Sequence, residues 1–237
     1  KVFKGNFENI DTIAYMAGVD KVDGILMDIG VSSKQLDDPE RGFSYRYDVK
    51  LDMRMNIEQK ISAYDVVNTY SEEQLSKIIF EYGEERHARK IAKLIVEERK
   101  SSPIEKTSDL ITLIKRAYPE RASKHPAKKT FQAIRIEVNR ELEVLENAIS
   151  KAVELLKVGG RLAIITFHSL EDRIVKNKFK DLATACKCPK DIPICVCGGV
   201  KKFEIITKKP IIPVDDELKN NNRAHSSKLR ILERILD

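Results

Sequence analysis

Two short apolar runs that each end in polar residues constrain the fold of this chain most. The first, VDGILMD at residues 22–28, stands just before Gly30, and the second, GGRLAIITFHS at 159–169, ends on a histidine and a serine. Compact apolar runs of this kind are typical of buried strands in a parallel sheet. Because ligands gather outside the carboxyl ends of such strands, we expect both polar segments at the functional edge of an α/β domain.

The long segment between these strands has the pattern of helices and loops. Ser71 and Gln74 fit a capping box at the start of one helix, and residues 84–100 predict a charged helix. Thr107 is expected to cap another. From 127 to 157, apolar residues recur at spacings of three and four, which predicts one long amphipathic helix. A crossover between parallel strands needs far fewer residues, so the sequence predicts an inserted helical domain.

After the second strand the sequence predicts one more helix and a final pair of strands. LEDRIVKNKFKDL, at 170–182, has a helical pattern. KKFEIITKK at 201–209 and SSKLRILERIL at 226–236 are expected to form an antiparallel hairpin. The polar connection at 210–225 is interpreted as a mobile loop.

The bulk properties favour a soluble protein with an anionic partner. The net charge of +6 and pI near 9.0 suit nucleic acid, although a basic excess spread over 237 residues also suits an ordinary solvated surface. No apolar run approaches the roughly 20 residues that cross a bilayer, and the first residues lack the apolar core of a secretory signal. We therefore expect a cytoplasmic protein without membrane contact, and the sequence leaves monomer and dimer open.

Asp28 and His168 are the candidate functional residues at the strand ends. Asp28 has two interpretations, a cap for the following turn or a ligand-contacting carboxylate. His168 and Ser169 could suggest a nucleophilic pair, but adjacent residues on a strand point to opposite faces and no G-x-S-x-G elbow is present. A histidine that contacts a ligand or braces the loop is the better interpretation.

A polar stripe on the predicted long helix is a candidate RNA contact. Gln132, Arg135 and Asn139 lie on one side of that helix, which is usually a solvated face. A basic cluster at the helix entry favours the alternative, in which lysines bind phosphates and the stripe reads base edges. The lysines of this cluster are Lys124, Lys128 and Lys129.

All four cysteines of the chain fall within twelve positions, at Cys186, Cys188, Cys195 and Cys197. In a reducing cytosol, such clustering suits a structural zinc site better than a disulfide framework. The C-x-C pairs depart from the commoner C-x-x-C knuckle, so ordinary thiols are the alternative.

Several long motifs resemble one bacterial family, the S-adenosylmethionine-dependent methyltransferases that modify the exocyclic N4 of a cytidine in the decoding region of 16S ribosomal RNA. They keep the family's order and span nearly all of the chain. The matching segments are DGILMDIGVSSKQLDDPERGFSY with LDMRM, YGEERHARKIA, HPAKKTFQAIRIEVNRELE, GGRLAIITFHSLEDRIVK and NNRAHSSKLRILER.

The resemblance implies a class I, Rossmann-like methyltransferase sheet with an inserted helical domain. We expect the methyltransferase domain at residues 1–38 and 137–237 and the substrate-recognition insert at 39–136. The chain as given is expected to begin near the third strand of such a domain, without the first strands and their Gly-rich loop. The family's cofactor contacts carry over to Phe7, Asp28 and Gln35.

The resemblance also implies a substrate site and partners. The substrate is 16S rRNA or the small ribosomal subunit, and methyl transfer from S-adenosylmethionine needs no metal. A catalytically silent RNA-binding or assembly factor on the same fold is the alternative, whereas methylation of DNA amines is disfavoured because Asp28-Ile-Gly-Val31 replaces an Asp-Pro-Pro-Tyr motif. The expected catalytic or substrate-contacting residues are Asp28, Ser32, Ser33, His168, Arg135 and Asn139.

Overall fold

The computed structural model describes residues 1–119, 126–186, 188 and 197–237 of the chain, which divide into two compact units. Unit 1 is Lys1–Gly30 with Leu142–Asp237, and unit 2 is Val31–Glu141. The helices of unit 2 are α2 (Ser33–Asp37), η2 (Pro39–Arg41), α3 (Ala63–Thr69), α4 (Glu72–Glu81), α5 (Ala88–Glu98), α6 (Thr107–Ala117) and α7 (Ala127–Asn139). The elements of unit 1 are η1 (Phe7–Asn9), α1 (Ile10–Ala17), β1 (Val22–Asp28), α8 (Glu141–Leu155, whose first residue belongs to unit 2), β2 (Leu156–Thr166), α9 (Ser169–Ala183), β3 (Phe203–Ile205), α10 (Asp215–Asn220), η3 (Asn222–Ser226) and β4 (Lys228–Arg234).

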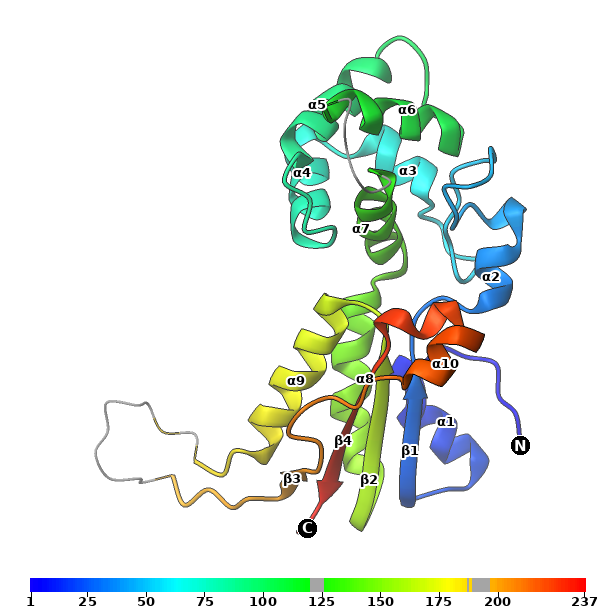
Figure 1. Cartoon of the computed structure of the whole chain (residues 1–237). Coiled ribbons are helices and arrows are strands. Elements are labelled where there is room, and N and C mark those ends of the chain that lie inside the picture. The colour runs from blue at the N-terminus through cyan, green and yellow to red at the C-terminus, as the bar shows by residue number, and fades with distance from the viewer. Residues whose placement is uncertain (120–125, 187, 189–196) are drawn as a thin grey trace. The chain divides into compact units, whose positions relative to one another are not determined.

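Unit 1 contains a four-stranded sheet in the order β1-β2-β4-β3 (Figure 1). β1 pairs with β2 in parallel, and β4 runs antiparallel to both β2 and β3. The predicted first strand and the parallel pairing are confirmed. β2 begins at Leu156, three residues before the predicted start at 159, because Leu156 already pairs with Val22. The sheet and its helices agree with the expected Rossmann-like α/β class.

Helices pack on one face of this sheet and form the core of unit 1. Met27 and Ile164, neighbours on β1 and β2, lie in one buried cluster with Ile149 of α8 and Phe179 of α9. The opposite face is more open, since Leu26 of β1 is 67% exposed. Residues alternate between the two faces along a strand, so Asp28 follows Leu26 onto the open face.

The C-terminal hairpin is confirmed, but the prediction that residues 210–225 form a loop is wrong. Helices α10 and η3 form there, between β3 and β4. Asp215, Asp216 and Glu217 occupy the first turn of α10, where acidic side chains interact favourably with the helix dipole.

Unit 2 is built from α3 to α7 around its own apolar core. The capping box of Ser71 and Gln74 is confirmed at the start of α4. The charged helix predicted from residue 84 begins only at Ala88, because Glu84 has a left-handed conformation with φ of 48°. Thr107 is the first residue of α6 rather than its cap, and its hydroxyl donates to the carbonyl of Tyr47 at 2.5 Å.

The single long helix predicted at 127–157 is wrong, because the chain forms two helices there. Arg140 has φ of 49° and ends α7, and α8 begins at the next residue. Phe131 and Ile134 before the break belong to the core of unit 2, whereas Leu145 and Ile149 after it belong to the core of unit 1. The apolar pattern is continuous in sequence, but it serves two cores.

The predicted domain limits, at 38/39 and 136/137, differ by a few residues from the division of the structure, which falls after Gly30 and after Glu141. The structural division places α2 and the last turn of α7 in unit 2. Among the described residues, no helix is both long enough and apolar enough to cross a membrane.

Candidate active site at the carboxyl edge of the sheet

The carboxyl ends of β1 and β2 lie side by side, which brings the two polar segments of the sequence to one edge. Asp28 pairs with Ile165, and the Ile29 amide donates to the Ile165 carbonyl at 3.3 Å. Gly30 lies beside Phe167, since a Cβ on Gly30 would stand 3.4 Å from the Phe167 ring. This is the edge at which open α/β sheets bind ligands.

Asp28 presents an exposed carboxylate at this edge. Its neighbour Met27 is 5% exposed on the covered face and fixes the end of β1 through the core. The Asp28 side chain has no packing role of that kind, because the residue is exposed. Phe7, in η1 of the same unit, keeps 37% of its surface exposed. An anionic group and an accessible aromatic ring are therefore both available in unit 1.

His168 braces the turn between β2 and α9. It is the N-cap of α9, and its Nδ1 accepts from the Glu171 amide at 3.4 Å. Its Nε2 lies 3.1 Å from a carboxylate oxygen of Glu171, and that carboxylate also accepts from the Phe167 amide at 2.8 Å. The Glu171 side chain is 3% exposed. The loop-bracing interpretation of His168 thus matches its contacts, and its side chain serves to orient the turn.

A buried charge cluster next to this turn was not found from the sequence. Asp172 accepts from Arg230 Nε at 2.6 Å and from Lys228 Nζ at 3.1 Å. Burial raises the pKa of the Asp172 carboxyl, but the hydrogen bonds from Arg230 and Lys228 outweigh it and hold the pKa below its ordinary value of 3.8. Arg230 occupies a buried position of β4, which the sequence alone does not reveal. The cluster joins α9 to β4 beside the carboxyl end of β2.

Ser32 and Gln35, predicted at the substrate and cofactor sites, form the capping box of α2 in unit 2. The Gln35 amide donates to Ser32 Oγ at 3.2 Å, and Gln35 Oε1 accepts from the Ser32 amide at 3.0 Å. Ser33 is the exposed first residue of α2. These hydrogen bonds fix the local backbone, and the exposed Ser33 hydroxyl remains accessible.

The polar stripe of α7 is used within unit 2. Asn139 Oδ1 accepts from the Met55 amide at 2.7 Å, and its Nδ2 donates to the Met53 carbonyl at 2.8 Å. Arg135 makes a two-point ion pair with Glu141 at 2.7 and 2.8 Å, and Gln132 donates to a backbone carbonyl at 3.1 Å. These side chains therefore brace α7 and the chain near residue 54, instead of forming the solvated face typical of such a stripe.

Replacing Asn139 with alanine is expected to destabilise the protein by about 1–3 kcal/mol. The change leaves the Met55 amide and the Met53 carbonyl without their partner. Chemical denaturation measures the effect, with Gln132→Ala as the control because, among the described residues, the Gln132 side chain donates one hydrogen bond, to the Tyr82 carbonyl. Equal stability of the two variants would show that Asn139 does not brace unit 2.

The predicted lysines at the start of α7 differ in their surroundings. Lys128 and Lys129 are exposed, and Lys129 donates to the Glu84 carbonyl at 2.7 Å. Lys124 lies outside the described residues. Lys128 therefore offers its charge to solvent more openly than Lys129.

Comparison with known proteins places the chain in a family. The model of the MraW methylase family matches residues 1–235. The chain belongs to the MraW methylase family. Ribosomal RNA small subunit methyltransferase H of Fusobacterium nucleatum subsp. nucleatum is 98% identical over 237 residues, which cover 100% of this chain and 76% of that protein. The proteins of the same name from Clostridium botulinum strain Kyoto and Clostridioides difficile strain 630 are 57% and 55% identical, over 97% and 99% of this chain and 75% and 76% of their own lengths. The resemblance found in the sequence is confirmed.

An MraW methylase must hold a methyl donor, and the residues of unit 1 suit a positively charged one. The exposed Asp28 carboxylate stands at the ligand-binding edge of the sheet and can accept charge-assisted hydrogen bonds. The accessible Phe7 ring offers an apolar surface for a flat heterocycle. Both belong to the predicted cofactor set, together with Gln35 in unit 2.

Proposed function

We propose that this methylase transfers the methyl group of S-adenosylmethionine to the exocyclic N4 of a cytidine in the decoding region of 16S rRNA, acting in the cytoplasm on the RNA or the small subunit. The observation that carries the proposal is the exposed Asp28 carboxylate at the joint end of β1 and β2 in a member of the MraW methylase family. The names of the similar proteins, all ribosomal RNA small subunit methyltransferases, support the substrate class.

For this reaction the protein must orient the cytosine amine, which is a poor nucleophile. S-adenosylmethionine, when bound, supplies an electrophilic methyl group on a sulfonium. The lone pair of the cytosine amine is delocalised into its ring, so the amine must be held in line and must donate its hydrogen bonds to fixed acceptors. The Asp28 carboxylate and the backbone carbonyls near Gly30 are suitable acceptors. His168 contributes as a positioning residue, because it fixes the turn after β2.

Unit 2 is proposed to bind the RNA and to present an unstacked base, since chemistry on a base requires it outside the stack. Exposed lysines at the start of α7 are suited to phosphate contact. Lys128 is exposed, whereas Lys129 also donates to the Glu84 carbonyl.

Replacing Lys128 with alanine is expected to lower RNA affinity several-fold and to reduce the slope of log K against log salt by about 0.7–0.9, the effect of one lost phosphate contact. Filter binding at several salt concentrations measures both. Lys93→Ala is the matched control, because Lys93 is an exposed lysine of the same unit that pairs with Glu97 at 3.8 Å. The same loss in both variants would mean that Lys128 acts only through net charge.

The function itself is tested with methyl-labelled S-adenosylmethionine and small-subunit RNA or particles. The proposal predicts label in N4-methylcytidine after digestion to nucleosides. Label at another atom, or none with either substrate, would contradict it. A silent RNA-binding factor would instead retard RNA and give no heat with S-adenosylmethionine in calorimetry.

A further inference from the structure

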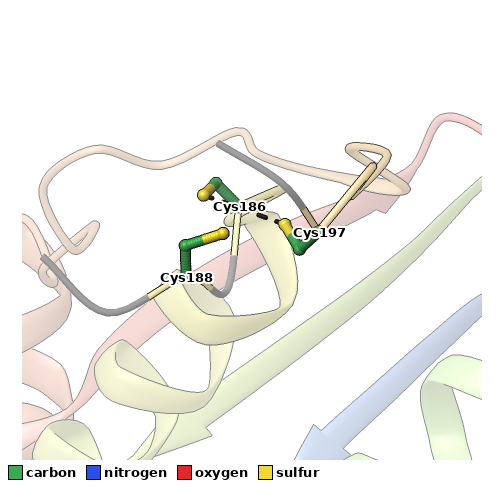
Figure 2. A group of neighbouring side chains, drawn as sticks. All are labelled: Cys186, Cys188 and Cys197. Carbon is green, nitrogen blue, oxygen red and sulfur yellow. Dashed lines mark hydrogen bonds between the residues drawn. The ribbon is translucent and has the colours of Figure 1, made fainter. Parts of the chain in front are cut away.

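Three cysteines from two separate chain segments meet near the C-terminal end of α9 (Figure 2). Cys186 and Cys188 follow the helix, and Cys197 belongs to the segment that leads toward β3. Their sulfur atoms all lie within 4.8 Å of one another, and those of Cys186 and Cys197 are 3.9 Å apart. Cys195, the fourth cysteine of the sequence cluster, lies outside the described residues.

The sulfur spacing suits one shared metal ion. Zinc binds thiolates at about 2.3 Å, so two sulfurs of a tetrahedral site stand about 3.8 Å apart. The distance of 3.9 Å between Cys186 and Cys197 is close to this value. It is far longer than the about 2.05 Å of a disulfide. Small shifts of the side chains can therefore place all three sulfurs around one ion.

Two glycines that follow Cys197 allow the two chain segments to approach each other closely. Gly198 has φ of 58°, in the left-handed region that favours glycine. Gly199 packs so closely on the other segment that an added Cβ would stand 1.8 Å from the Ala185 carbonyl oxygen and 3.3 Å from Cys197 Sγ. The two glycines thus let the segment after Cys197 approach the backbone next to Cys186. Cys186 and Cys197 are eleven residues apart in the chain.

We propose that Cys186, Cys188 and Cys197 form a zinc site that ties the end of α9 to the segment before β3. On binding, the three thiols lose their protons to solvent and bind Zn²⁺ as thiolates, without any change of oxidation state. Zinc is favoured because it binds thiolate ligands in tetrahedral geometry, in which the three sulfurs would take three of the four positions. The role is structural and independent of methyl transfer.

The direct test is the metal content of the full chain, purified with a phosphine reductant and without chelator. We expect about one zinc per chain, or stoichiometric uptake of added Zn²⁺ after its removal. Cys186→Ser and Cys197→Ser should each lose most of the bound zinc. Less than about half an equivalent in the wild-type chain after added Zn²⁺, or full retention in both variants, would overturn the proposal.

Cobalt substitution reports the ligands without any assay of activity. Co²⁺ bound to thiolates gives sulfur-to-metal charge-transfer absorption and the strong visible bands of tetrahedral geometry. We expect this spectrum in the wild-type chain and its weakening in Cys188→Ser. A spectrum typical of octahedral oxygen ligands would contradict a thiolate site.

Substitutions of Gly198 and Gly199 test whether the close approach of the two segments builds the site, because they leave every cysteine in place. Gly199→Ala should weaken zinc affinity by about tenfold or more, because its Cβ cannot fit beside Ala185. Gly198→Asn is the matched control, since asparagine tolerates the left-handed conformation and a Cβ there meets no atom within 4 Å. Equal zinc affinity in both variants, with circular dichroism unchanged, would show that the approach of the two segments does not build the site.

Discussion

Replacing Asp28 with asparagine is expected to lower methyl transfer and S-adenosylmethionine affinity by about 10- to 100-fold. A hydrogen bond to a charged group contributes about 1.5–3 kcal/mol, and about 1.4 kcal/mol corresponds to a factor of ten. The exposed Asp28 side chain lies outside the core of unit 1. The melting temperature should therefore stay within a few degrees, because surface substitutions seldom change stability by more than about 0.5 kcal/mol. Calorimetry with S-adenosylmethionine and thermal denaturation measure the two effects.

Asp23→Asn is the matched control for this experiment. Asp23 lies on the same strand, is exposed, and pairs with Lys157 at 2.9 Å, away from the carboxyl end of the strand. We expect no change in cofactor affinity. A large loss of stability in Asp28→Asn, with affinity unchanged, would mean that Asp28 serves only as a cap for the following turn.

Replacing Asp172 with asparagine is expected to destabilise the protein by about 3–5 kcal/mol, the cost of leaving a buried charge without its partner. Arg230 is 7% exposed and makes bonds of 2.6 and 3.2 Å to Asp172. Glu233→Gln is the control, because its partner Arg161 has 60% of its side chain exposed and such pairs contribute at most about 1 kcal/mol. Equal effects in urea denaturation would show that the cluster does not hold α9 to β4.

We also expect Asp172→Asn to change how the stability of the protein depends on pH in acid. The pKa of Asp172 is below 3.8 in the folded protein, so its contribution is present above that pH and is lost as the pH falls through the folded-state value. Asp172→Asn should therefore flatten the loss of stability below about pH 4. A variant whose acid denaturation parallels that of the wild type would exclude this carboxylate as a source of the pH dependence.

The sheet could be predicted from the sequence because its strands are short, apolar and followed by polar residues. VDGILMD forms β1 with the predicted bounds, and LAIITF lies within β2 except for its last residue. The break at Arg140 could not be predicted in the same way. Arg140 has φ of 49°, and an arginine carries no local signal for a left-handed conformation.

The candidate site was predictable only in part. The exposed end of β1 follows from the strand pattern, but the partners of Asn139 and Asp172 come from chain segments more than 50 residues away. Those contacts depend on tertiary packing. Helical spacing places the polar residues of α7 on one face, but it does not reveal what covers that face.

We propose that the tip of β1 borders the methyl donor. A crystal structure of the protein with S-adenosylhomocysteine tests it most directly. We predict the ligand at the carboxyl ends of β1 and β2, with an oxygen of Asp28 within hydrogen-bond distance of it. Ligand density bound elsewhere, with Asp28 still facing solvent, would contradict the account.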